Sequence, residues 1–199
     1  MAAGYGARRV LAGVTLTLHG GETLVVAGAN GSGKSTLLRM LCGLQRPTAG
    51  RITYSVAGRR YQPDAARDLV GWVAPDLQLY RELTALENLQ FFAQVRGLRR
   101  SPIELEALLD QVGLGGRGGD LLVAYSSGMA QRLRYAYALL HGPAVLLLDE
   151  PTVTLDERGA ALVERVVAAQ RERGITVIAT NDPREVRFGD YVLRLGTGG

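Results

Sequence analysis

The sequence predicts an α/β fold in which a parallel sheet is interrupted by a block of helices. Short apolar runs of strand length alternate with segments whose apolar residues recur at helical spacing. A glycine-rich loop joins one of these runs to a helix, and residues 79–142 carry mainly helical patterns. A chain of 199 residues can bury a continuous core, so we expect a single domain over residues 1–199.

The early part of the chain contains three candidate strands and one helix. Residues 23–27 form a compact apolar run before a glycine loop, which indicates a buried strand. A helix is expected over residues 36–44. Residues 51–56 and 69–74 are further candidate strands.

The middle of the chain predicts three helices. Residues 84–87 (Thr-Ala-Leu-Glu) and 101–104 (Ser-Pro-Ile-Glu) both fit the capping-box pattern that starts a helix. Gly113 is expected to end the second of these helices. A third helix is expected over residues 127–141, before Gly142 and Pro143.

The strand pattern returns after this insertion. Residues 145–148 are continuously apolar, as in a strand buried on both faces. A helix capped by Asp156 is expected to run to about residue 173, where Gly174 ends it. Residues 175–180 and 191–195 predict the last strands. We therefore expect a core lobe, residues 1–78 and 143–199, and a helical subdomain at about 79–142.

The composition limits which kinds of partner and cellular setting we expect for this protein. The net charge is +4, but the basic residues are scattered with no dense run, so we expect solvated surface arginines and no nucleic acid partner. The single cysteine, Cys42, excludes an intrachain disulfide and is expected to pack as a small hydrophobe. No signal peptide and no apolar stretch of bilayer-spanning length is visible, so a transport role would need a separate membrane chain.

Residues 28–35 read Gly-Ala-Asn-Gly-Ser-Gly-Lys-Ser and fit the phosphate-loop pattern G-x-x-x-x-G-K-[ST]. Lys34 is the only lysine of the chain, and it lies in this loop. Glycines allow backbone N–H groups to surround phosphate oxygens, the lysine neutralises the β- and γ-phosphates, and Ser35 can ligate Mg²⁺. The residues expected to bind nucleotide are Gly28, Ala29, Asn30, Gly31, Ser32, Gly33, Lys34, Ser35 and Thr36.

Two carboxylates, Asp149 and Glu150, follow the buried strand at 145–148. Ligands of open α/β sheets bind at the carboxyl ends of the strands. We expect Asp149 to hold Mg²⁺, directly or through water, and Glu150 to orient and polarise the attacking water. Together with the phosphate loop, these residues predict a P-loop NTPase (RecA-like) core that binds ATP and Mg²⁺.

Residues 125–132, Tyr-Ser-Ser-Gly-Met-Ala-Gln-Arg, extend the pattern to a family. They resemble the LSGGQ signature, followed by Gln-Arg, of the ATP-binding subunits of ABC transporters, and the likeness covers nearly the whole chain. The signature stands at a helix N-terminus, whose free N–H groups suit a phosphate. The resemblance implies that Ser126 and Gly128 contact the γ-phosphate held by an opposite subunit, so that two subunits enclose two ATP molecules.

Other segments agree with this resemblance. Residues 153–156 are similar to the loop that couples paired subunits, and Tyr5 is similar to the aromatic residue that stacks on adenine. Family members usually have a strand before that tyrosine, so we expect either a start further upstream or a reduced first strand within a small N-terminal β portion.

Two positions depart from the family pattern. Pro75 stands where a glutamine usually meets Mg²⁺ and senses the membrane subunit, and Gln78 is a candidate substitute. Asn181 stands where a histidine usually bonds the γ-phosphate; an amide donates a hydrogen bond but carries no charge. We expect turnover through Glu150, Lys34 and Asn181, at a reduced rate.

Residues 83–89 and 125–129 look most like the haem exporter ATPase subunit of cytochrome c maturation. The resemblance implies an ATPase at the cytoplasmic face of the membrane, paired as a homodimer or heterodimer beneath an integral-membrane permease. The alternative is a catalytically weak, regulatory ATP clamp in a heterodimer. A soluble relative acting on ribosomes or DNA is disfavoured, because those proteins commonly carry two ATPase units or long inserted arms.

Overall fold

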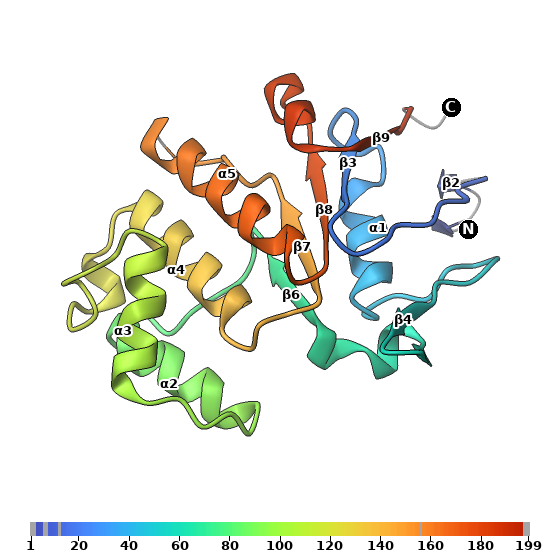
Figure 1. Cartoon of the computed structure of the whole chain (residues 1–199). Coiled ribbons are helices and arrows are strands. Elements are labelled where there is room, and N and C mark those ends of the chain that lie inside the picture. The colour runs from blue at the N-terminus through green and yellow to red at the C-terminus, as the bar shows by residue number, and fades with distance from the viewer. Residues whose placement is uncertain (1–2, 6–7, 12, 156, 197–199) are drawn as a thin grey trace.

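The computed structural model describes residues 3–5, 8–11, 13–155 and 157–196. Its centre is a five-stranded parallel sheet in the order β6-β7-β8-β3-β9 (Figure 1). The strands are β3 (Thr23–Ala27), β6 (Val70–Val73), β7 (Val145–Asp149), β8 (Ile175–Thr180) and β9 (Tyr191–Arg194). The predicted α/β fold with a parallel core is confirmed, and each of its five strands lies within one residue of a predicted one at each end.

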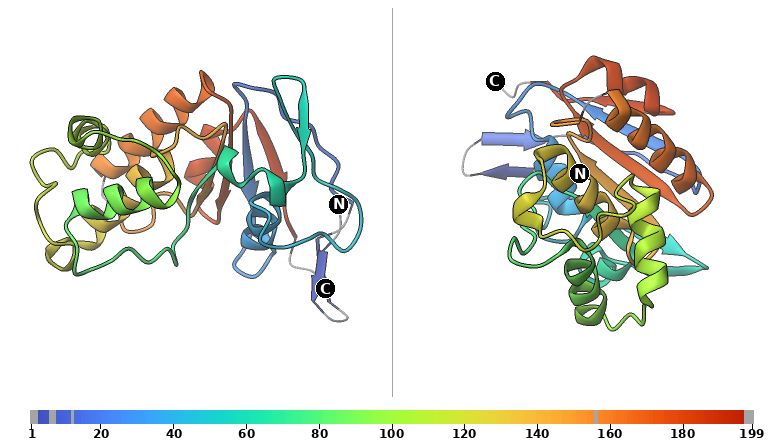
Figure 2. Two further views of the ribbon diagram at one scale, coloured as in Figure 1. Left: turned by 90° about the horizontal axis from the view of Figure 1, so that it is seen from below. Right: turned by 90° about the vertical axis from the view of Figure 1, so that its left-hand side faces the viewer.

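Apolar side chains cover both faces of this sheet, as the continuous apolar runs predict. Successive residues of β7 point to opposite faces: Leu146 and Leu148 pack with the helices α2 to α5, while Val145 and Leu147 pack with α1. Figures 1 and 2 show α2, α3 and α4 gathered on one side of the molecule, with α1 on the other side of the sheet.

The helices begin largely where the capping patterns predict. Thr84 and Ser101 each form a complete capping box, with Glu87 and Glu104 respectively. Among the described residues, no helix is both long and apolar enough to cross a bilayer. The α-helices are α1 (Lys34–Leu41), α2 (Ala85–Val95), α3 (Pro102–Gln111), α4 (Ser127–Leu139) and α5 (Glu157–Arg171).

Helix α1 differs from its predicted range of 36–44. It starts at Lys34, directly after Gly33 in the left-handed region, with a φ of 101°. It ends at Leu41 because Gly43 has a φ of 76°, which turns the backbone out of the helix. The other expected cap, Asp156, lies outside the described residues.

Two small antiparallel hairpins flank the core. The expected strand at 51–56 is shorter, because only β4 (Tyr54–Val56) pairs, and its partner is the unpredicted β5 (Arg59–Tyr61). Ala57 and Gly58 between them both have positive φ, as a tight hairpin turn requires. The N-terminal hairpin joins β1 (Ala3–Tyr5) to β2 (Arg8–Leu11). Short 3-10 turns lie at Pro63–Ala65, Arg67–Leu69, Leu122–Ala124 and Pro183–Phe188.

Gly174 ends the segment after α5 for a steric reason. A Cβ built on this residue would lie 1.9 Å from the carbonyl oxygen of Ala144, which precedes β7. Gly174 is not among the glycines with a positive φ, so its backbone conformation does not require a glycine. The glycine therefore permits two backbone segments to approach closely. A glycine after a helix predicts only the end of that helix, and not this contact.

Candidate functional site

The phosphate loop runs from the end of β3 to the first turn of α1. Gly31 and Gly33 have φ of 79° and 101°, conformations that L side chains rarely adopt. A Cβ on Gly28 would lie 2.7 Å from the carbonyl oxygen of Leu195, so this glycine permits a close backbone approach. The loop opens directly into a helix N-terminus, which favours bound anions.

Lys34 turns back over this loop. Its ammonium donates hydrogen bonds to the carbonyl oxygens of Gly28 (2.9 Å) and Ala29 (3.2 Å). The side chain is 6% exposed, and Nζ lies 3.4 Å from Oε1 of Glu150, whose side chain is 18% exposed. A buried positive charge is therefore held between the loop and the acidic end of β7.

Asp149 is the last residue of β7 and is buried. Burial raises the pKa of its carboxyl, although a hydrogen bond with Ser35 and the charge of Lys34 act in the opposite direction. Asp149 and Ser35 thus bring a carboxylate and a hydroxyl oxygen together at the entrance of α1.

Glu150 has a φ of 49°, in the left-handed region that costs a non-glycine residue free energy. Its amide donates to the carbonyl oxygen of Ala179 at 2.8 Å, which continues the contact between β7 and β8. A strained backbone at a carboxylate beside a phosphate loop is typical of a functional residue.

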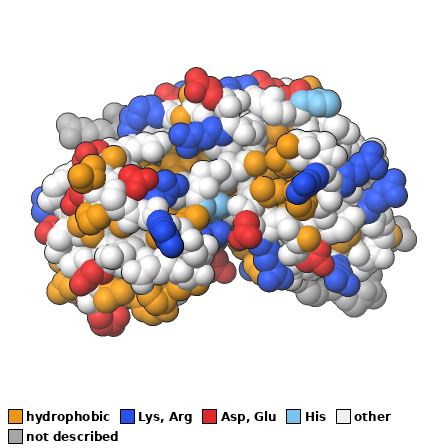
Figure 3. Space-filling model, turned by 60° about the horizontal axis from the view of Figure 1, so that its bottom comes forward, with side chains coloured by type: hydrophobic (Ala, Val, Ile, Leu, Met, Phe, Trp, Pro, Cys, Tyr) orange, Lys and Arg blue, Asp and Glu red, His pale blue; other side chains and the backbone are white. Residues whose placement is uncertain are grey.

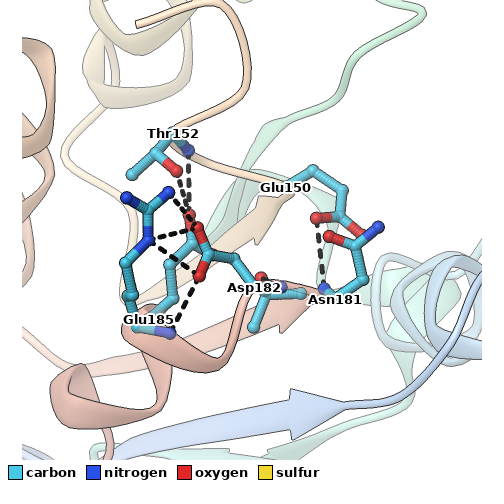
Figure 4. Close-up of polar contacts among 7 residues, drawn as sticks. Glu150, Thr152, Asn181, Asp182 and Glu185 are labelled. Atoms are coloured by element: carbon cyan, nitrogen blue, oxygen red, sulfur yellow. Dashed lines mark hydrogen bonds and ion pairs between the residues drawn. The ribbon is translucent and has the colours of Figure 1, made fainter. Parts of the chain in front are cut away.

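Asn181 follows β8 and bridges the two motifs. Its backbone amide donates to Oε2 of Glu150 at 3.2 Å, as Figure 4 shows. Its side-chain amide donates to Oδ1 of Asn30 in the phosphate loop at 3.0 Å. The position predicted for a γ-phosphate contact therefore lies between the loop and Glu150.

A cavity of about 440 Å³ collects these groups. Its lining residues are Asn30, Gly31, Gly33, Lys34, Ser35, Thr36, Pro75, Asp149 and Glu150. Gln78, the expected substitute for the missing glutamine, is exposed and does not line this cavity. Tyr5 lies in β1, but its side chain is outside the described part of the structure.

The signature segment lies at the start of α4, away from this cavity. Ser126 is the N-cap of the helix, and its hydroxyl accepts a hydrogen bond from the amide of Met129 at 3.2 Å. Ser126 is exposed, and Gly128 is half-buried. Within one chain, neither residue lines the cavity of the phosphate loop.

One buried carboxylate near the site, Glu185, was not predicted from the sequence, and it is 3% exposed. Its Oε1 accepts hydrogen bonds from both the backbone amide (3.2 Å) and the hydroxyl of Thr152 (Figure 4). Burial raises the pKa of Glu185, and the hydrogen bonds from Thr152 oppose that rise. Its position four residues after Asn181 could have indicated that it lies near the site, but the local sequence does not distinguish it from an exposed glutamate.

The surface gives no competing site of dense charge on the face shown in Figure 3, where Lys and Arg side chains are interspersed with Asp and Glu. Over the described residues, no cluster of three or more His, Cys, Asp or Glu side chains forms a protein-only metal site. The cavity at the phosphate loop is thus the best-supported candidate.

Residues 11–153 match the sequence family described as ABC transporter. This range contains the phosphate loop, the signature segment and the acidic end of β7. It ends before Asn181 and Glu185.

Individual relatives agree with that match. The linearmycin resistance ATP-binding protein of Bacillus subtilis is 35% identical over 189 residues, which cover 92% of this chain and 60% of the relative. The macrolide export ATP-binding/permease protein of Salmonella typhimurium is 36% identical over 199 residues, which cover 95% of this chain and 30% of the relative. The chain thus spans less than two thirds of either relative.

A solved structure shares the whole fold. It is the dimeric, post-hydrolysis state of an ATP-binding cassette bound to ADP and phosphate, with a TM-score of 0.82 and 25% sequence identity. The match covers 98% of this chain and 90% of that one.

Proposed function

Because this chain belongs to the ABC transporter family, we propose that it is the ATP-hydrolysing part of a transporter that exports a small molecule. As a member of that family it binds ATP and is an ATPase. The observation that carries the proposal is the convergence of Lys34, Asp149 and Glu150 on one cavity near the carboxyl ends of β3 and β7, which lie on either side of β8 in the parallel sheet.

The phosphate loop supplies the binding contacts. Backbone N–H groups of residues 28–36 surround the phosphates, and the ammonium of Lys34 moves from its carbonyl partners to the β- and γ-phosphates. Glu150 accepts a proton from the attacking water and orients it towards the γ-phosphate. Asn181 donates its side-chain amide to a γ-phosphate oxygen, and Tyr5 stacks on the adenine.

Magnesium fits the same place. Hydroxyl and carboxylate oxygens are the ligands this ion takes together with substrate phosphates, and it uses few protein carboxylates. Ser35 and Asp149 provide this pair of oxygens, and Gln78 is the further candidate that we assign from sequence alone. Bound Mg²⁺ would neutralise charge that develops on the phosphates.

The signature segment acts in a second copy. Ser126 and Gly128 do not line the cavity of their own chain, so we assign their contact with the γ-phosphate to a partner ATPase domain, in a homodimer or heterodimer. We assign residues 1–78 and 143–199 to a nucleotide-binding core lobe and residues 79–142 to a helical subdomain that faces an integral-membrane permease on the cytoplasmic side.

The names of the relatives support export, since one confers linearmycin resistance and another exports macrolides. Haem for cytochrome c maturation remains the cargo proposed from sequence, beside compounds of the kinds these relatives handle. With either kind of cargo, the same ATPase chemistry would act beneath a permease that selects the cargo.

A second candidate function is a regulatory ATP clamp within a heterodimer. Pro75 lines the cavity where the family's glutamine would meet Mg²⁺, and Asn181 cannot carry the charge of the family's histidine. Such a subunit would bind ATP and hydrolyse it slowly or not at all.

Mg²⁺-dependent ATP hydrolysis by the purified protein separates the two candidates. We expect hydrolysis that Glu150→Gln reduces about 100-fold or more, since removal of a positioned general base costs this much. Glu172→Gln, an exposed glutamate outside the cavity, is the matched control and should retain the rate. Tight ATP binding without turnover in the wild type would favour the clamp, and an absence of ATP binding by folded protein would refute both.

A further inference from the structure

The turn after the catalytic carboxylate is held by groups on both sides. Glu150, Pro151 and Thr152 leave β7, and the hydroxyl of Tyr135 in α4 donates to the carbonyl oxygen of Pro151 at 3.0 Å. One residue later, Thr152 donates both its amide and its hydroxyl to Glu185 in the 3-10 turn at Pro183–Phe188. Figure 4 shows this carboxylate lying beside the turn while Glu150 points the other way, towards Asn181.

The contact of Tyr135 with Pro151 is buried, and the contacts of Thr152 with Glu185 are partly buried. Tyr135 has no exposed surface, and Glu185 is 3% exposed. Oε1 of Glu185 accepts both hydrogen bonds from Thr152, whereas the buried Oε2 has no hydrogen-bond partner among the described residues. Because burial of a polar group is costly without hydrogen bonds, the carboxyl depends on its contact with Thr152. The amide and hydroxyl of Thr152 together fix both the position and the direction of this residue.

Glu150 needs such support because its own backbone is strained. Its φ of 49° is unfavourable for a side chain with a Cβ and persists only where the surroundings impose it. The amide of Glu150 is held by Ala179 of β8, and Asn181 holds one carboxylate oxygen. The carbonyl side of the residue leads directly into Pro151 and Thr152.

On the basis of the proposed ATPase function, we propose that Glu185, through Thr152, is a positioning residue for Glu150. The contact anchors the residue two places after Glu150 and so maintains the backbone conformation that directs the catalytic carboxylate into the cavity. Glu185 does not line the phosphate-loop cavity, so it acts through the turn and not on the nucleotide.

Tyr135 extends the support to the helix that carries the signature segment. It lies in α4, which begins with Ser126 as its N-cap. The turn after Glu150 is therefore hydrogen-bonded on one side to α4 and on the other to the 3-10 turn that follows β8. A shift of either element would move the backbone that follows the catalytic carboxylate.

Two substitution pairs test the contact. Thr152→Val keeps the shape and removes the hydroxyl, whereas Thr152→Ser keeps the hydroxyl. Glu185→Leu removes the acceptor, whereas Glu185→Gln keeps an oxygen acceptor. Gln170→Leu is the matched control: Gln170 is as buried as Glu185, and its side-chain amide donates to the carbonyl oxygen of Pro143, before the start of β7.

The measurements are kcat for ATP hydrolysis, the equilibrium Kd for ATP and the melting temperature. We expect Thr152→Val and Glu185→Leu to lower kcat about 10- to 100-fold, because a small misplacement of a reacting group has effects of this size. Their Kd for ATP should stay within about threefold of the wild type, since the phosphate loop is untouched. Thr152→Ser and Glu185→Gln should recover most of the rate, and Gln170→Leu should lower the melting temperature with little effect on kcat.

Three outcomes would overturn the proposal. The first is an unchanged kcat in folded Thr152→Val and Glu185→Leu while the wild type hydrolyses ATP, which would leave the ATPase function standing. The second is an equal loss of kcat in Gln170→Leu at the same loss of stability, which would show general destabilisation. The third is a wild type without turnover, which would remove the proposed function as well.

Discussion

The ammonium of Lys34 lies 3.4 Å from the carboxylate of Glu150, so the phosphate loop and the end of β7 form an ion pair across the candidate site. Lys34 is almost fully buried, and a buried charge is stabilised when it has partners. The γ-phosphate of a bound nucleotide would compete with Glu150 for this ammonium. The residue proposed for hydrolysis therefore also opposes binding.

Glu150→Gln should consequently bind ATP more tightly than the wild type. The neutral amide releases Lys34 for the phosphates and removes repulsion between two groups of negative charge. We expect Kd to fall several-fold, with a smaller change at high salt because screening weakens the repulsion. Equilibrium titration at two salt concentrations measures this. Unchanged or weaker binding would show that the ion pair does not compete with nucleotide.

The backbone of Glu150 predicts an unusual order of stability. At a φ of 49°, Glu150→Gly should be more stable than Glu150→Ala by about 1 kcal/mol, since glycine adopts this conformation without strain. Arg165, exposed in the interior of α5, is the control site. There the alanine variant should be the more stable by about 1 kcal/mol. Urea unfolding of the four variants decides the matter, and the same order at both sites would contradict a strained Glu150.

Asn181 should contribute to turnover through its side-chain amide. Asn181→Ala loses the contact with Asn30 and the proposed donor to phosphate, so kcat should fall several-fold to about tenfold. Asn181→His restores a donor that can become charged. Its rate relative to the wild type should rise as the pH falls through about 6.5, where a histidine protonates. A pH-independent ratio would argue against contact with the phosphate.

His141 should make stability sensitive to mild acid. Burial, followed by the charge of Arg96, lowers the pKa of His141 to about 4, and the charge of Arg100 acts in the same direction while Asp68 opposes it. An unfolded histidine titrates near 6.5, so the folded state binds the proton less readily. The stability due to neutral His141 is therefore complete above about pH 6.5 and is lost as the pH falls towards 4.

Urea midpoints at pH 7 and pH 5 test this prediction. The difference between the two midpoints should shrink in His141→Gln, which has no group to protonate, and persist in His19→Gln, the exposed control. An equal difference in the wild type and His141→Gln would assign the acid sensitivity to other groups.

The sheet and the phosphate loop are predictable because their signals are local. Residues 23–27 and 175–180 match β3 and β8 at both ends, since a buried parallel strand is an uninterrupted apolar run between breakers. The spacing of Lys34 after Gly28 likewise fits the phosphate-loop pattern, which predicts a loop between a strand and a helix. The roles of these site residues, and the haem cargo, stay predictions that binding and turnover measurements can test.

What the sequence could not predict depends on contacts between distant segments. The pairing of β8 with both β3 and β7 is invisible to periodicity, which reports faces and not neighbours. The burial of Glu185 arises only when its turn folds against Thr152. The strained φ of Glu150 occurs where the end of β7 meets β8, and no residue pattern predicts it.

The place of β8 between β3 and β7 has a consequence for synthesis of the protein on the ribosome. The strands that precede the phosphate loop and Glu150, β3 and β7, do not pair with each other, and β8, which joins them, is made after both. A nascent chain that stops short of residue 175 would leave unpaired the edges of β3 and β7 that β8 later joins, and unpaired edges are prone to non-native association. ATP in the cell can therefore favour the native fold only after translation has passed β8, when its binding site first comes into being.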